Sequence, residues 1–163
     1  MDMVEFFENL DVPKFYNPNS WILEDCFKML IQLKTDLTIK DFDGCDLDII
    51  DNFDETLLIH AVKTFKNRSL EMLIEKGASL EMANDKGITP IGQAIISRNA
   101  KALDILLENG ANIHKNSVLD LSISNKVMKP MHYIAKFIRL IGVPVELQPI
   151  LDILEKHKID ILD

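Results

Sequence analysis

Thr56-Leu57-Leu58-Ile59-His60-Ala61 and Thr89-Pro90-Ile91-Gly92-Gln93-Ala94 are two copies of one segment in the chain. The match runs on without a gap to Leu73-Ile74-Glu75-Lys76-Gly77-Ala78 and Leu106-Leu107-Glu108-Asn109-Gly110-Ala111. The repeat length, about 33 residues, is the one expected for a turn followed by two helices. The chain therefore predicts a stack of helix pairs, and it directs the search for function toward a partner rather than a catalytic site.

The second copy shows why each part of the unit folds as predicted. Asp85-Lys86-Gly87 favours a turn, in which glycine is free to adopt positive φ. Thr89 can cap the first helix. Pro90 suits the first helical position because the amide hydrogen that proline lacks would have no partner inside the helix there. Leu103, Leu106 and Leu107 form the apolar stripe of the second helix, which Gly110 ends.

The two clear units, residues 51–114, resemble ankyrin repeats. The resemblance implies an all-α fold, an ankyrin-repeat helical solenoid of about four helix pairs with hairpin loops. The units depart from the family pattern at Leu57, where proline is preferred, and at Ile59 and Gly92, where histidine is preferred. Arg98 stands where a glycine usually ends the inner helix. These departures affect local stability rather than the fold.

The flanks of the repeats read as divergent units of a single domain, residues 1–163. We expect residues 1–50 to form a degenerate N-terminal cap or repeat with an acidic loop. Residues 115–163 are expected to form a degenerate C-terminal repeat and cap. Within that part we predict a short inner helix over 117–125, a longer outer helix over 129–141 and a final helix over 149–157.

The formal net charge of −8 disfavours a nucleic-acid partner, because phosphates would be repelled. The acidic start lacks the basic and apolar regions of a signal peptide, and no apolar stretch approaches about 18 residues, so we expect no membrane partner. Cys26 and Cys45 show no pairing pattern. We therefore expect a cytoplasmic protein that is monomeric when free.

The sequence gives no pattern for catalysis, a cofactor or a metal. The four histidines are scattered, and neither a CxxC nor an HExxH spacing is present. The run from Asp41 to Asp48 resembles a calcium loop superficially but lacks the ligand spacing with a terminal glutamate. Glycine-rich phosphate loops and GxSxG elbows are also missing from the sequence. We accordingly assign no catalytic, cofactor-binding or metal residues.

The resemblance implies a concave binding face built from hairpin tips and the exposed side of the inner helices. Carried over by motif position, the partner-binding residues are Asn52, Phe53, Glu55, Lys63 and Thr64 in the first unit and Asp85, Lys86, Ile88, Ile96 and Ser97 in the second. The apolar members either anchor a partner or pack against adjacent hairpins, and both alternatives stay open.

An acidic block over residues 36–55 adds a second feature. It holds eight carboxylates against the single basic residue Lys40, and Asp41, Asp43, Asp46 and Asp48 are its central members. Such a block would steer a basic partner electrostatically. The alternative is a solvated loop that keeps the hairpin tips from aggregating.

These features predict a non-catalytic protein–protein interaction module. The sharper hypothesis is an immunity protein that binds and inhibits a basic, nuclease-like bacterial toxin. Small size, acidity and the lack of a catalytic pattern suit a protein that covers a basic active site. The alternative is an ankyrin-type effector or regulatory adaptor that binds a signalling or host protein. It would depend on Phe53, Ile88 and Ile96 rather than on the aspartates. An enzyme with an unrecognised site is the remaining alternative.

Overall fold

The computed structural model describes residues 40, 46–48, 50, 55–115, 118–120 and 126–160. Its elements, in chain order, are α3 (Leu57–Lys63), α4 (Asn67–Glu75), α5 (Pro90–Ile96), α6 (Ala100–Glu108), β1 (Val118–Asp120), β2 (Lys126–Met128), α7 (Pro130–Ile141), the short 3-10 helix η3 (Val145–Leu147) and α8 (Gln148–Lys156). Among these residues, no helix is long and apolar enough to cross a membrane.

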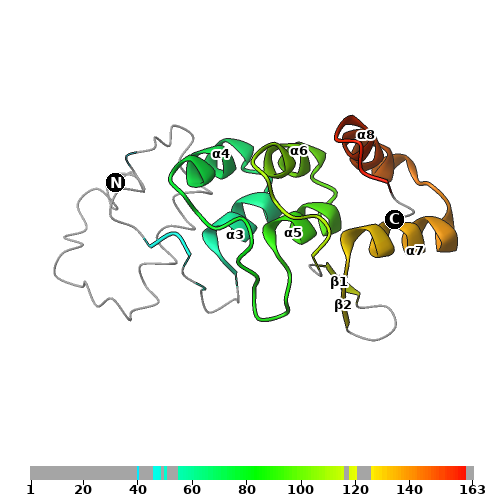
Figure 1. Ribbon diagram of the computed structural model, residues 1–163, viewed down its shortest axis with the longest axis horizontal. Coiled ribbons are helices and arrows are strands. Elements are labelled where there is room, and N and C mark those ends of the chain that lie inside the picture. The colour runs from blue at the N-terminus through cyan, green and yellow to red at the C-terminus, as the bar shows by residue number, and fades with distance from the viewer. Residues whose placement is uncertain are drawn as a thin grey trace, which may run out of the picture.

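The helices form two rows, which confirms the all-α solenoid. Helices α3, α5 and α7 make the inner row and α4, α6 and α8 the outer row (Figure 1). Neighbours in the rows pack on one another, α3 on α5 and then α4 on α6 on α8. The described residues thus hold three helix pairs of the four or so expected, and the upstream unit lies outside them.

The inner helices begin as the repeated threonines predict. The Thr56 hydroxyl oxygen accepts a hydrogen bond from the Ile59 amide at 3.1 Å, and Thr89 accepts one from Gly92 at 3.4 Å. Pro90 occupies the first position of α5. These caps satisfy amides that have no partner inside the helix, and they fix the start of each inner helix at the same point of the repeat.

The outer helices end at the repeated glycines. Gly77 and Gly110 have φ of 92° and 86°, a conformation that side chains disfavour. The following amides, Ala78 and Ala111, donate back to the Leu73 and Leu106 carbonyls, each at 3.0 Å. This is the pairing of a glycine-terminated helix, so the predicted helix ends are confirmed.

The core lies between the two rows. Ala61 and Ala94, the small residues of the repeat, are completely buried and let the inner helices approach closely. Leu103 and Leu106 are also completely buried, whereas Leu107 packs at the edge of the core. The stripe predicted for the outer helix therefore faces the inner row.

The prediction of a short inner helix over residues 117–125 is wrong. Val118–Asp120 is strand β1, and it pairs antiparallel with β2 in the register Val118 to Met128, Leu119 to Val127 and Asp120 to Lys126. Serine and asparagine between the strands are weak helix formers, and valine in each strand suits an extended backbone. The hairpin lengthens the third unit: the N-caps Thr56 and Thr89 are one repeat length apart, but the next N-cap, Lys129, comes later than that repeat length places it.

Helix α7 matches the predicted helix over 129–141, but it belongs to the inner row, not the outer (Figure 1). The outer partner is α8, close to the predicted final helix over 149–157. Its end repeats the pattern of the other outer helices: Lys158 has φ of 56°, and the Ile159 amide donates to the Leu154 carbonyl at 2.9 Å. The inserted hairpin explains why a fixed repeat length assigns α7 to the wrong row.

Candidate functional site

The C-terminal ends of the inner helices carry the residues expected on the concave face. Lys63 and Thr64 end α3, and Ile96 and Ser97 end α5 one repeat later. Because α3 packs on α5, these four residues lie on neighbouring helices, and we call them the inner-helix row. Lys63 is exposed, whereas the other three are half-buried.

Internal hydrogen bonds orient the polar members of the inner-helix row. The Thr64 hydroxyl donates to the His60 carbonyl at 2.8 Å, and the Ser97 hydroxyl oxygen accepts from the Gln93 side-chain amide at 2.7 Å. Each hydroxyl therefore retains further hydrogen-bonding capacity toward solvent or a partner. Ile96 supplies an apolar surface in the same row.

Glu55 is buried, and its carboxylate is engaged within the fold. Its relative exposure is 9%, its carboxylate accepts a hydrogen bond from the Lys63 ammonium group, and its Oε2 lies 3.2 Å from Nδ1 of His60. Burial of a carboxylate is favourable only when it is paired in this way. Glu55 thus positions Lys63 and offers a partner little surface of its own.

The loop between α4 and α5 presents Asp85 and Lys86 as exposed residues at its tip. The side chain of Asn84 shapes the tip, since its Oδ1 accepts from the amides of Lys86 at 3.1 Å and Ile88 at 2.9 Å. Ile88 itself is 7% exposed. This burial favours the packing alternative for Ile88, and we leave it out of the surface proposed below.

Gly87 is required at this tip for two reasons. Its φ is 75°, and a Cβ at this position would lie 2.9 Å from a methyl group of Val127. The hairpin β1–β2 therefore packs directly against the tip of the preceding loop. This contact supports the orientation of Asp85 and Lys86.

An acidic side chain joins each loop to the next. Asp48 Oδ1 accepts from the Ser79 amide at 2.8 Å, and Glu81 Oε1 accepts from the Asn112 amide at 2.7 Å. The two acceptors are one repeat length apart and so are the two donors, which makes this one interaction repeated by the stack. Asp48, expected to contact a partner, is thus already engaged with the neighbouring loop.

The remaining members of the predicted surface divide into two groups. Asp46 is exposed, and its Oδ1 accepts from the Asp48 amide at 3.1 Å. Asp41, Asp43, Asn52 and Phe53 lie outside the described residues. The structure therefore brings together the inner-helix row and shows Asp46, Asp85 and Lys86 on exposed loops.

An exposed aromatic residue that the repeat pattern had not indicated, Phe65, lies in the turn between α3 and α4. It is 55% exposed and has φ of 60°, which is rare for a bulky side chain. It stands one repeat length before Arg98, whose φ is 56° and whose guanidinium lies 5.5 Å from the ring centre of Phe137. The repeat offset from Arg98 was the signal that could have found Phe65.

The described residues contain one group of metal-ligand type, Asp104, Glu108 and His157. Lys156 already binds both carboxylates, with its Nζ 2.6 Å from Asp104 and 2.9 Å from Glu108, while His157 Nε2 lies 2.8 Å from Asp104. These hydrogen bonds, from Lys156 above all, lower the pKa of the Asp104 carboxyl. The group joins α6 to α8, and we interpret it as a set of ion pairs that holds the two outer helices together.

Comparison with protein families supports the repeat. Residues 22–117, more than half of the chain, match a family model described as ankyrin repeats in three copies. The match begins upstream of the two clear units and ends before β1, so α7 and α8 lie beyond it. No curated protein matches the chain.

Proposed function

This chain belongs to the ankyrin-repeat family, a family of protein–protein interaction modules, and from that premise we propose that it captures a basic protein partner. In its sharpest form the proposal is an immunity protein that binds and inhibits a basic, nuclease-like bacterial toxin in the cytoplasm. The protein would act by covering the toxin's surface, without chemistry of its own.

The observation that carries the proposal is charge. The chain has a net charge of −8, and residues 36–55 hold eight of its carboxylates against one lysine. Complementary charge accelerates encounter and discriminates against wrong partners more than it adds affinity. A toxin with a basic active site is the kind of partner that such a surface selects.

The geometry narrows which carboxylates can take part. Asp48 and Glu55 are engaged within the fold, so the surface we propose consists of Asp46, Asp85 and Lys86 on the loops and the inner-helix row, together with Asp41, Asp43, Asn52 and Phe53. Exposed aspartates would steer the partner. Ile96 and Phe53 would supply the apolar contacts.

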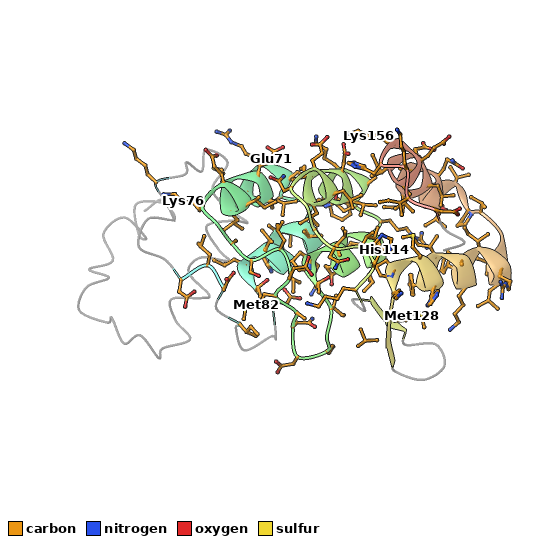
Figure 2. All side chains as sticks on the ribbon, in the orientation of Figure 1. Glu71, Lys76, Met82, His114, Met128 and Lys156 are labelled. Atoms are coloured by element: carbon orange, nitrogen blue, oxygen red, sulfur yellow. The ribbon has the colours of Figure 1, made fainter. Side chains whose placement is uncertain are left out.

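A capture experiment at low and at high salt tests the proposal. Tagged protein is incubated with lysate of the source cells, and bound proteins are identified by mass. We expect one basic protein, bound less well by Asp43→Asn/Asp46→Asn. The matched control is Glu71→Gln/Glu75→Gln, which removes two exposed charges from α4; Glu71 lies on the outer-helix side, away from the loop side marked by Met82 (Figure 2).

The opposite result favours the adaptor alternative, which rests on the half-buried Ile96 and on Phe53. Capture of a regulatory protein that is indifferent to salt and to the aspartate variant, but is lost in Ile96→Ala, would replace the immunity proposal. The aspartates would then serve solubility alone.

A further inference from the structure

Four of the five large apolar side chains that are exposed among the described residues lie close together in the chain, between the end of α7 and the start of η3. They are Leu140 (68%), Ile141 (63%), Val143 (51%) and Val145 (85%), and with Arg139 we call them the C-terminal tip. Single exposed apolar residues need no explanation, but a cluster rimmed by polar groups marks an interaction site. The high exposure of Val145 indicates a protrusion rather than a groove.

The same part of the chain has the opposite charge to the rest. Residues 126–145 contain Lys126, Lys129, Lys136 and Arg139 and no aspartate or glutamate, which gives +4. Since the whole chain has −8, the remainder has −12. Lys129, His132 and Arg139 are exposed, and their spacing places them with Lys136 on one face of α7. Charge asymmetry of this kind indicates an anionic surface as partner.

We propose, against the expectation from the sequence of no membrane partner, that the C-terminal tip docks this protein reversibly on an anionic membrane surface. Binding of a protein segment at a membrane interface grows with the apolar area that it buries and with its attraction to anionic lipids, and an apolar insertion beside basic residues supplies both. Protein hot spots are enriched in tryptophan, tyrosine and arginine, with leucine and valine under-represented, whereas the apolar part of the tip is wholly aliphatic. Single-stranded nucleic acid is bound by stacking on aromatic rings, which residues 139–145 lack.

The position of the tip makes this docking compatible with an acidic protein. Helix α7 lies at the end of the row of helices, and the tip is its C-terminal end (Figure 1). Charges are screened beyond about 8 Å at physiological salt, so carboxylates further along the stack have little effect there. The proposal is independent of the proposed function, which uses the loops and the inner-helix row.

Co-sedimentation with vesicles tests the proposal on the full chain. We expect binding to vesicles that contain phosphatidylserine, little binding to phosphatidylcholine alone, and weakening by salt. Each cation near such a surface raises the affinity for the membrane about fivefold, so Lys136→Gln/Arg139→Gln should bind about 25-fold less tightly. Leu140→Ser/Val145→Ser should bind about tenfold less tightly. Glu146→Gln, which removes the exposed carboxylate beside the tip, should bind about fivefold more tightly.

Matched variants elsewhere on the molecule serve as controls. Phe65→Ser removes an exposed apolar residue, and Arg68→Gln/Lys101→Gln removes two exposed cations; both should bind as the unaltered protein does. Absence of binding to phosphatidylserine vesicles, or equal binding by tip and control variants, overturns the proposal. Tip variants that change self-association in sedimentation equilibrium while vesicle binding is unaffected would assign the tip to a second copy instead. If the serine variant unfolds, Arg139→Gln and Glu146→Gln still decide by their opposite signs.

Discussion

Replacing Asn99 by alanine should destabilise the protein more than replacing an exposed asparagine by alanine. The side chain is 2% exposed, and its Oδ1 caps α6 by accepting from the Ala102 amide at 3.0 Å. Its Nδ2 donates to the Val62 carbonyl at 2.9 Å and to Asn67 Oδ1 at 3.3 Å. Because Val62 and Asn67 belong to the preceding helix pair, one side chain starts α6 and ties two repeats together.

The expected loss follows from those bonds. An N-cap contributes about 1 kcal/mol, and a buried acceptor left without its donor costs about 1 kcal/mol more. We take the low end for the acceptor because the Val62 carbonyl also accepts from the Phe65 amide at 3.3 Å. The sum for Asn99→Ala is about 2 kcal/mol, which lowers the melting temperature of a chain this size by about 4–8 °C.

Urea denaturation followed by far-ultraviolet circular dichroism measures the effect, provided that the slope with denaturant is unchanged. Asn99→Ser keeps the cap but loses the donor, so we expect about half of the loss, about 1 kcal/mol. Asn109→Ala is the matched control: its Nδ2 donates to the Ile105 carbonyl at 2.8 Å, but the residue is exposed. A loss for Asn99→Ala no larger than that of the control would refute the role assigned to Asn99.

Three further changes test other parts of the stack in the same assay. Lys66 stands before α4 where Asn99 stands before α6, but it makes no side-chain cap, so Lys66→Asn should add about 0.5–1 kcal/mol; no gain would contradict the equivalence. Phe65→Gly should stabilise by about 0.5–1 kcal/mol, because positive φ costs more for phenylalanine than glycine loses in chain entropy, and a net loss would show that the exposed ring packs. Asp104→Asn should lower the melting temperature by about 2 °C at pH 7, and this difference should vanish in acid. The Lys156 hydrogen bond holds the pKa of Asp104 below 3.8, so the stabilisation is present above that pH and is lost as pH falls through the folded-state pKa; a constant difference would contradict this.

The caps and helix ends could be predicted from sequence because they depend on local chemistry. A threonine hydroxyl reaches an amide three residues away, and a glycine adopts positive φ wherever the outer helix must end. Both kinds of residue recur at the repeat offset, so Thr89 and Gly110 confirm what Thr56 and Gly77 indicate. The repeat offset no longer holds after Asn112, because the hairpin β1–β2 adds residues there. No local sequence pattern shows how many residues are added.

The sequence left open whether Ile88 is exposed or packed, because the exposure of a loop residue depends on which parts of the folded chain lie against the loop. Its place at the loop suggested an anchor for a partner, yet it is 7% exposed. Val127, far along the chain, packs on the adjacent Gly87 and belongs to the hairpin whose first strand, β1, the sequence pattern had assigned to a helix. An error in one unit therefore carries over into the contacts expected for its neighbour.

The acidic residues illustrate how composition can overstate a binding surface. Among the described members of the acidic block, Asp46 is exposed, Asp48 holds the Ser79 amide and Glu55 is buried against Lys63 and His60. Asp48 and Glu55 are part of the fold, so neutralising them would loosen the stack as well as reduce the charge. Binding lost on changing Asp48 would thus confuse stability with recognition. Asp46→Asn separates the two, because it removes an exposed charge and keeps Oδ1 as the acceptor for the Asp48 amide.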